Sequence, residues 1–394
     1  MKSSAEIHGF CEPTFAPLKA AFVANFDDGL ELGASLAATH QGRMVCHLWA
    51  GWADAARTRP WAENTIVRLF STTKIPLIFC MLKLIDQGKV ELDAPVARYW
   101  PEFAAGGKSH VTVRHAMTHQ GGVPGFNPPI VTGRELYDWE AMCAQIAADE
   151  HWFGGAPRYC YHSTTYGYLL GEIIRRVDGR MPSDVFAQEI AGPAGIDLAM
   201  PLASATEVAR TAELVMLDMP TEPPPPPSDP FVARAMQSSG LNFEFEANLE
   251  EWNSTRCALT EQPAGAGYGN GRSIACMGAI AAMGGELNGR RYFSEAIVRD
   301  ATALQAWAND AYFGWINMGL GFGLNADDFR APSATAFHWG GIGGSFCVMD
   351  RATSVSCGYA PNNMIFGEIM GLGPRNERMW TALGEAMAAV RASM

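Results

Sequence analysis

Strand-like segments lie near both ends of the chain and frame a long helical middle. In the N-terminal part, two apolar runs at 34–40 and 44–50 are separated by a three-residue turn, which predicts a hairpin. In the C-terminal part, residues 346–350 and 355–359 form a second pair of runs around a turn. The segments between the two pairs are mostly short helical patterns broken by turns. This arrangement predicts a mixed α/β (α+β) chain in which one sheet is assembled from both termini, with an inserted, mainly helical region.

Apolar residues at helical spacing predict helices over several segments, namely 13–27, 71–87, 164–176, 273–283 and 378–394. A short apolar run at 65–70 leads into the second of these helices. Pro76 falls within its first turns, where proline is tolerated, and Gly88 is a suitable stop. Five consecutive prolines at 223–227 predict an extended surface loop that connects its neighbours.

The charge pattern excludes several classes of function. The 394 residues carry 29 Lys and Arg against 41 Asp and Glu, a formal net charge of −12, and no lysine follows Lys108. Such an acidic, lysine-poor chain is a poor partner for nucleic acid, because that binding depends on neutralising phosphates. No run reaches the ~18 apolar residues of a membrane helix, and no apolar core of signal-peptide length follows Met1. We therefore expect a cytoplasmic protein without nucleic-acid or membrane partners; the composition leaves its oligomeric state open.

The spacing of cysteine and histidine gives little support to a metal site. Nine cysteines form no C-x-x-C pair, and several lie in apolar runs, which favours buried free thiols in a reducing compartment over zinc or redox sites. His115 and His119 have the i, i+4 spacing of zinc-binding helices. However, the Glu of H-E-x-x-H is absent, and the segment 120–122 ends any helix at once. We expect neither a metal nor another cofactor.

The strongest catalytic candidate is the tetrapeptide Ser71-Thr72-Thr73-Lys74, in a chain without a G-x-S-x-G motif. Lys74 is the only lysine with a serine three residues upstream. At the start of a helix this spacing puts both side chains on one face, and the helix dipole favours negative charge near Ser71. Serine needs a neighbouring proton acceptor to become a nucleophile. Lysine can serve near neutral pH only if burial or another cation lowers its pKa from ~10.4. The alternative is an N-capping serine followed by a surface lysine.

Two later motifs strengthen the catalytic interpretation. Tyr161-His162-Ser163 stands at the entrance of a predicted helix, where the phenol can act as an acid or base if cations lower its pKa; the alternative is a core tyrosine with a hydrogen-bonded hydroxyl. Trp339-Gly340-Gly341 precedes the strand at 346–350. Glycines there let a ligand approach the backbone closely, and edge N–H groups can face an oxyanion; the alternative is a glycine-rich bulge.

In this order and at these separations, the three motifs resemble those of the penicillin-recognising serine hydrolases, above all class C β-lactamases and family VIII carboxylesterases. Ser71 to Lys74 is similar to S-x-x-K and Tyr161 to Ser163 is similar to Y-x-N/S. Trp339-Gly340-Gly341 lies where lactamases carry K-T-G and many of the esterases carry W-G-G or H-G-G. The resemblance covers most of the chain. It implies a β-lactamase-like fold whose central antiparallel sheet is built from both termini (1–70 and 272–394). A mainly helical domain (71–271) with lid and connector loops is inserted, and the active site lies between the two.

The resemblance also implies a role for each motif. Ser71 would be the acylated nucleophile, Lys74 its partner in the proton network, and Tyr161 the general base for acylation and the acid for the leaving group. The oxyanion hole would consist of the N–H groups of Ser71 and Ile342, unless His338 rather than Trp339 fills the family position and the register moves by one.

Two departures from the lactamase pattern favour small, largely apolar esters as substrates. The lysine of K-T-G cannot be present, and Ser163 stands where lactamases carry an asparagine. We therefore expect a carboxylesterase for short-chain esters. An amidase or peptidase, an acyltransferase, a weak β-lactamase and a non-catalytic ligand-binding protein are the alternatives. The predicted substrate contacts are Ser163, Trp339, Gly340, Gly341, Phe126, Trp152 and Tyr159, with Phe153, Phe243, Trp252 and Tyr268 as further aromatic candidates for the cleft.

Overall fold

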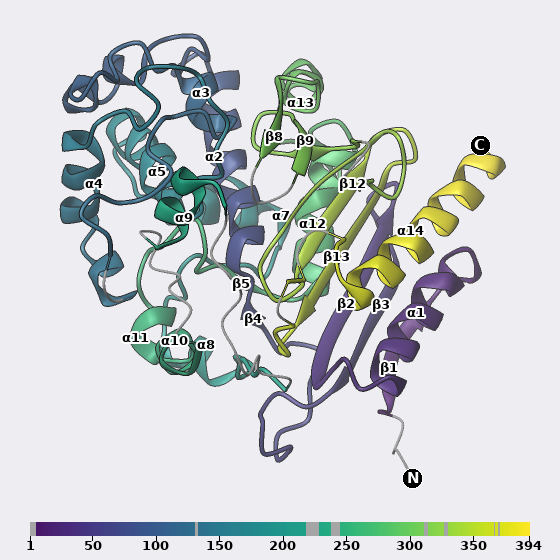
Figure 1. Cartoon of the computed structure of the whole chain (residues 1–394). Helices are drawn as coiled ribbons and strands as arrows, with labels where there is room; N and C mark the ends of the chain where they lie inside the picture. Colours follow the sequence, from purple (N-terminus) through teal and green to yellow (C-terminus); the bar gives the residue numbers. More distant parts are fainter. Residues whose placement is uncertain are drawn as a thin grey trace.

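The computed structural model describes residues 5–130, 133–217, 228–237, 245–310, 314–326, 330–365, 367–368 and 371–394. Its centre is a nine-stranded antiparallel sheet with the order β1-β3-β2-β13-β12-β11-β10-β9-β8 (Figure 1). The middle of this sheet joins the two ends of the chain, because β2 pairs with β13 over seven residue pairs from Ala34↔Pro361 to His40↔Val355. The prediction of one sheet built from both termini is therefore confirmed.

The strands have the bounds β1 Ile7–Cys11, β2 Gly33–His40, β3 Arg43–Gly51, β4 Val67–Arg68, β5 Tyr268–Gly269, β6 Glu286–Leu287, β7 Arg290–Arg291, β8 Ala306–Asp310, β9 Gly314–Met318, β10 Gly323–Leu324, β11 Ala336–Gly340, β12 Phe346–Asp350 and β13 Val355–Pro361. The central strands β12 and β13 are buried at every residue. They lack the alternation of apolar and polar residues because helices cover both faces of the sheet.

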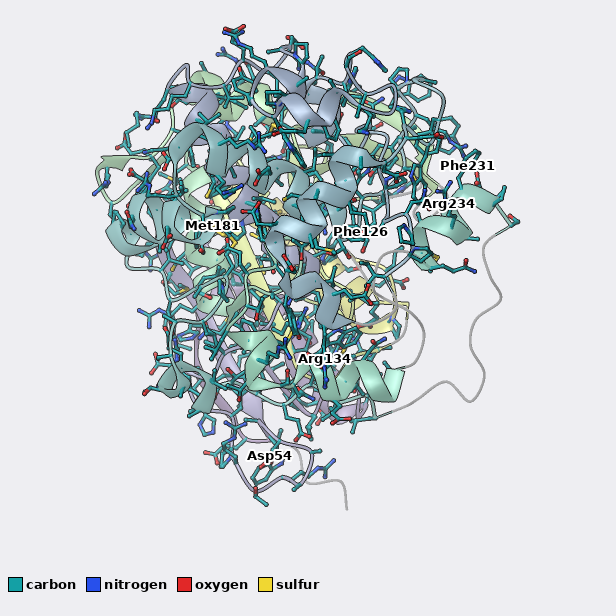
Figure 2. All side chains as sticks on the ribbon, turned by 90° about the vertical axis from the view of Figure 1, so that its left-hand side faces the viewer. Asp54, Phe126, Arg134, Met181, Phe231 and Arg234 are labelled. Carbon is teal, nitrogen blue, oxygen red and sulfur yellow. The ribbon has the colours of Figure 1, made fainter. Side chains whose placement is uncertain are left out.

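The helices are α1 Ala16–Asp27, α2 Lys74–Asp86, α3 Val113–Met117, α4 Trp139–Ala148, α5 Thr165–Asp178, α6 Pro182–Phe186, α7 Gly192–Ala194, α8 Ala205–Ala209, α9 Pro230–Gln237, α10 Phe245–Trp252, α11 Thr255–Ala258, α12 Gly271–Ala282, α13 Glu295–Ala301 and α14 Pro374–Ser393. Figure 1 shows α1 and α14 together on one face of the sheet, and α12 on the other face with the helical middle of the chain beyond it. Figure 2 views that helical side, with Phe126 among its helices and Phe231 and Arg234 on α9 at its margin.

The predicted helices and both strand pairs are present, with ends that shift by a few residues. The sequence patterns missed β8 to β11, because these strands are short or contain glycine and polar residues. The helix predicted from residue 71 begins instead as a 3₁₀ turn, η2 (Phe70–Thr73), which passes into α2. The proline run at 223–227 lies outside the described residues, as does Phe243.

The two connections between the sheet and the helical middle run side by side. The short strand β4 precedes η2, and β5 precedes α12, and the two strands pair through Val67↔Gly269 and Arg68↔Tyr268. The division into units at 70/71 and 271/272 stays a prediction. Among the described helices, none is long and apolar enough to cross a membrane. All nine cysteines are free thiols, and seven of them are buried.

Candidate active site

Ser71 lies in the tight turn η2 between β4 and α2. Distant segments hold this turn, because Leu69 N–H donates to Gly267 O (2.8 Å) and Ser345 Oγ donates to Leu69 O (2.7 Å). Phe70, directly before Ser71, has a φ of +46°, in the left-handed region that side chains rarely adopt. Such backbone strain persists only where the surrounding structure enforces it, and it clusters at functional sites.

Lys74, the first residue of α2, is fully buried and makes three polar contacts. Its Nζ lies 3.0 Å from Ser71 Oγ, 2.7 Å from Ser163 O and 3.1 Å from Ala264 O. Burial holds the pKa of Lys74 well below its usual range, since desolvation penalises the ammonium ion and all three contacts are with neutral groups. The structure thus confirms that both side chains meet and that Lys74 is not a surface lysine.

Tyr161 completes the group around Ser71. Its hydroxyl donates to Ser71 Oγ at 2.8 Å, and Lys74 Nζ lies 5.0 Å from the centre of its ring. Behind the ring lie His119, at a centroid distance of 4.9 Å, and Trp339, at 5.9 Å. Ser71, Lys74 and Tyr161 therefore form one hydrogen-bonded cluster although they come from segments 90 residues apart.

Two buried histidines support Tyr161 from behind. His162 N–H donates to His119 Nδ1 at 3.2 Å. His162 Nδ1 lies 2.7 Å from Cys160 O, and Nε2 accepts the N–H of Val123 at 3.3 Å, so this ring carries its proton on Nδ1. Burial lowers the pKa of His162 to about 4 and that of His119 well below its ordinary value. Both rings are neutral at pH 7 and serve as packing and hydrogen-bonding groups.

The histidines of the candidate zinc motif have separate roles. His115 belongs to the N-terminal capping box of α3, where its Nδ1 accepts the N–H of Thr112 at 3.3 Å. His119 instead stacks on Tyr166 with a centroid distance of 4.3 Å. A search of the described residues finds no group of three or more His, Cys, Asp or Glu side chains that could hold a metal ion.

The third motif lies at the end of β11 and continues into a glycine-rich turn. Trp339 is fully buried, and its ring stacks on His119 at 5.7 Å. A side chain at position 341 would place Cβ 2.3 Å from Leu69 O, so Gly341 is required for the close approach of the η2 turn. Ile342 follows and lines the pocket beside Ser71. Among the described residues, no hydrogen-bond acceptor faces the backbone N–H of Ser71 or Ile342.

A buried ion network holds the turn that carries Ile342. Arg375, the second residue of α14, donates to Gly343 O (2.5 Å), to Glu368 Oε2 (2.7 Å) and to Glu31 Oε2 (3.0 Å). A Cβ on Gly344 would lie 2.4 Å from the guanidinium, so the absence of a side chain at residue 344 leaves the space that Arg375 occupies. Burial raises the pKa of Glu31 to about 8.

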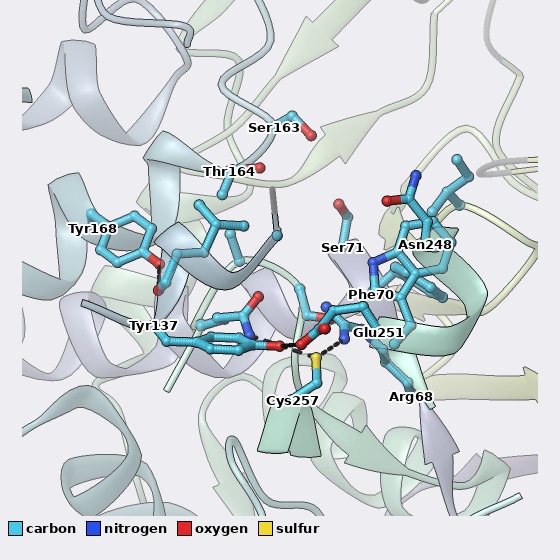
Figure 3. A pocket seen from close by; sticks show the side chains of 17 residues that line it. Arg68, Phe70, Ser71, Tyr137, Ser163, Thr164, Tyr168, Asn248, Glu251 and Cys257 are labelled. Atoms are coloured by element: carbon cyan, nitrogen blue, oxygen red, sulfur yellow. Dashed lines mark hydrogen bonds between the residues drawn. The ribbon is translucent and has the colours of Figure 1, made fainter. Parts of the chain in front are cut away.

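The pocket beside Ser71 has an empty volume of about 650 Å³ (Figure 3). Side chains from separate segments line it: those of Arg68, Phe70, Ser71, Leu136, Tyr137, Ser163, Thr164, Tyr168, Asn248, Glu251, Trp252, Cys257, Gln262, Ala264 and Ile342, with the backbone of Gly133 and Gly265. Ser71 and Ser163 lie at one side, and a hydrogen-bonded cluster around Cys257 lies at the opposite side. This pocket is a concave site, lined mainly by apolar surface with a few polar groups, as small-molecule sites are.

Several predicted substrate contacts lie elsewhere. Of the predicted residues, Ser163, Ile342 and Trp252 line the pocket, whereas Trp339, Gly340 and Gly341 do not. Trp339, predicted as a substrate contact, lies behind Tyr161 instead, because β11 turns its ring into the core. The aromatic residues Phe126, Trp152, Tyr159, Phe153 and Tyr268 also lie outside the lining. They pack against neighbouring helices and loops: Phe126 contacts Tyr168, Trp152 donates to Asp149 Oδ2, and Tyr159 contacts His119.

Comparison with known proteins identifies the family. A family model described as Beta-lactamase matches residues 22–371, most of the chain. The chain belongs to the beta-lactamase family. It is 34% identical to a structure described as a family VIII carboxylesterase, with a TM-score of 0.86 over 96% of this chain and 98% of that one. It is also 34% identical to a penicillin-binding protein homologue from Caulobacter crescentus, with a TM-score of 0.85 over 97% of this chain and 100% of that one.

A curated relative covers nearly the whole chain as well. The esterase/beta-lactamase LipL of Mycobacterium tuberculosis is 29% identical over 92% of this chain and 85% of its own length. Family membership confirms two predictions: the family resemblance that was drawn from the three motifs, and the β-lactamase-like fold that it implied.

Sequence reasoning missed most of the pocket of this beta-lactamase-family chain. Arg68 and Tyr137 are examples: Arg68 lies on β4 directly before the motif serine, and Tyr137 ends a 3₁₀ segment in the helical middle. The position of Arg68, three residues before Ser71, was a usable signal because both residues belong to one short backbone segment. Tyr137, Asn248 and Glu251 offered none, because only the tertiary fold brings their segments to Ser71.

Proposed function

We propose that this protein is a serine carboxylesterase that works through an acyl-enzyme on Ser71. The observation that carries the proposal is the contact of one hydroxyl oxygen, Ser71 Oγ, with both Tyr161 OH (2.8 Å) and Lys74 Nζ (3.0 Å). Both partners are within the reach that proton transfer requires. The names of the relatives, which include esterases, support the ester as the bond that is cleaved.

The buried amine of Lys74 supports the proton path. In its neutral form, Lys74 has two N–H groups, which match the carbonyl oxygens of Ser163 and Ala264, and one lone pair, which faces Ser71 Oγ. In acylation, Ser71 Oγ attacks the ester carbonyl while its proton passes to the Lys74–Tyr161 pair. The same proton then passes from Tyr161 to the leaving alcohol. In deacylation, water attacks the acyl-enzyme and the pair returns a proton to Ser71, so that acid and alcohol are the only products.

The amide groups of Ser71 and Ile342 are the proposed oxyanion donors. Ile342 lines the pocket, and both N–H groups are without an acceptor in the described part of the chain. Fixed donors at this place stabilise the charge that develops on the carbonyl oxygen. If His338 were the first motif residue, the donor would be Gly341, but the N–H of Gly341 already donates to Ser345 O (2.8 Å), which supports Ile342 and the register with Trp339 first.

Hydrolysis of p-nitrophenyl acetate, butyrate and octanoate, beside a chromogenic cephalosporin, tests the proposal. We expect ester turnover that Ser71→Ala abolishes, with little cephalosporin turnover. Tyr161→Phe should lower kcat by ~10²-fold or more, the scale of general acid–base catalysis. A purified Ser71→Ala variant with wild-type ester turnover would refute the mechanism. Product formation that an added alcohol raises above hydrolysis would assign an acyltransferase instead.

A further inference from the structure

Arg68 is a buried cation in the wall of the pocket. It belongs to β4, three residues before Ser71, and only 6% of it is exposed. Its Nε donates to Gly265 O at 2.9 Å, its Nη1 donates to Cys257 Sγ at 2.5 Å, and its guanidinium lies 5.0 Å from the ring centre of Phe70 (Figure 3). None of these partners is a carboxylate.

The charge of Arg68 is not balanced within the described residues, where no Asp or Glu oxygen lies within 4.0 Å of its guanidinium. The other deeply buried arginine, Arg375, shows the usual arrangement, since it contacts the carboxylates of both Glu31 and Glu368. A buried charge without a counter-ion is costly, and proteins normally pair it. Arg68 is thus an exception, and it is placed where a ligand can reach it.

The described surroundings of Arg68 offer it no free carboxylate. Gln262 Nε2 points at the same sulfur atom as Arg68, with a distance of 3.7 Å to Cys257 Sγ. The one carboxylate in the lining, Glu251, is already engaged, because one oxygen accepts from the Tyr137 hydroxyl and the other from Arg134 Nε at 3.0 Å. Arg134 compensates that negative charge from outside the pocket. The side of the pocket opposite Ser71 therefore carries an excess positive charge beside an apolar wall.

We infer that the pocket binds esters that carry a carboxylate group, and that Arg68 is the residue that recognises this carboxylate. The inference rests on the proposed function and specifies its substrate class. A guanidinium in a site of low dielectric binds a carboxylate through strong, charge-assisted hydrogen bonds. The substrate would be a half-ester of a dicarboxylic acid if the acyl group enters the pocket, or an ester of a hydroxy acid if the alcohol does.

Matched pairs of esters test this inference. On the acyl side, p-nitrophenyl hemiadipate is compared with p-nitrophenyl methyl adipate, in which the same carboxylate is capped. On the alcohol side, 4-acetoxybenzoate is compared with its methyl ester. We expect kcat/KM of the free carboxylate to exceed that of its capped partner about tenfold or more in one pair. Arg68→Met should lower this ratio at least tenfold, and Arg68→Lys should retain part of it.

Arg43→Met is the matched control, because it removes the same charge at an exposed residue of β3 outside the pocket. It should leave the ratio unchanged. A wild-type ratio of one or less in both pairs overturns the inference even if Arg68→Met does not fold. Turnover of the capped esters that depends on Ser71, without preference for the carboxylates, refutes this inference alone. Absence of turnover of all four esters, with p-nitrophenyl butyrate still hydrolysed through Ser71, also refutes this inference alone, whereas absence of turnover of all five esters refutes the proposed function.

Discussion

The buried ion network around Arg375 leads to the sharpest prediction of stability. The side chains of Arg375 and Glu31 are 0% exposed and that of Glu368 is 1% exposed. Removing one partner of such a network leaves an uncompensated charge and costs ~3–5 kcal/mol. Arg375→Met would leave the Glu368 carboxylate without its counter-ion, whereas Glu31 is mostly protonated at pH 7 because burial raises its pKa to about 8. We therefore expect a loss of ~3–4 kcal/mol in the free energy of unfolding.

Urea unfolding at pH 7, followed by tryptophan fluorescence, measures this loss. Arg43→Met is the control, since Arg43 pairs with Glu12 at a site where the side chains are 64% and 37% exposed. Exposed pairs contribute ~0–1 kcal/mol. A loss below ~1 kcal/mol for Arg375→Met, or equal losses for the two variants, would refute the reasoning.

The same variant reports on the oxyanion turn. Arg375 donates to Gly343 O, next to the proposed donor Ile342. If this contact positions the turn, the folded fraction of Arg375→Met should lose kcat by ~10²-fold, the effect of losing one oxyanion donor, with a much smaller change in KM. Wild-type kcat in the folded fraction would show that the network serves stability alone.

Three further outcomes follow from the same contacts. Gly344→Ala should lower stability and kcat together, because its Cβ would lie 2.4 Å from the Arg375 guanidinium at a φ of +105°; unfolding and ester assays with unchanged values would contradict this. Folded Glu31 keeps a proton that the unfolded chain releases, so the free energy of unfolding should fall as pH rises from about 4.5 to about 8. Urea midpoints measured at pH 5 and at pH 8 should therefore differ in the wild type, and this difference should be smaller in Glu31→Gln. Because burial lowers the pKa of Lys74, kcat/KM should rise with pH as the ammonium loses its proton. Lys74→Arg remains charged, so its rate should be at least ~10²-fold lower and its kcat/KM should no longer rise with pH. A variant whose kcat/KM still rises with pH would exclude Lys74 from the proton path.

The sequence was sufficient to predict that Ser71 lies beside Lys74 and Tyr161. Ser71 and Lys74 are one helical turn apart, so their contact follows from local geometry. Tyr161 is distant in sequence, and its place beside Ser71 was predicted only through the resemblance to a known family. The sheet could be predicted from both ends because β2, β3, β12 and β13 are continuous apolar runs.

The pocket and its supports could not be predicted in the same way. Trp339 is an example, because its motif indicated a substrate contact, while the direction of β11 turns its ring into the core. The glycines of the same motif indicated close approach by a ligand, whereas the group that approaches Gly341 is the backbone oxygen of Leu69. Such contacts depend on which side chains meet across the fold, and no local pattern encodes them.

The pairing of β2 with β13 also has a consequence for synthesis of the protein. Until residues 355–361 leave the ribosome, β2 (Gly33–His40) is an apolar edge strand without its partner. About 300 residues separate the two strands, which at roughly 5–20 residues per second leaves that edge open for about 15–60 s. The turn that carries Ile342, the proposed oxyanion donor, is made in the same final stretch of chain. A nascent chain therefore cannot complete the proposed site before its sheet can close.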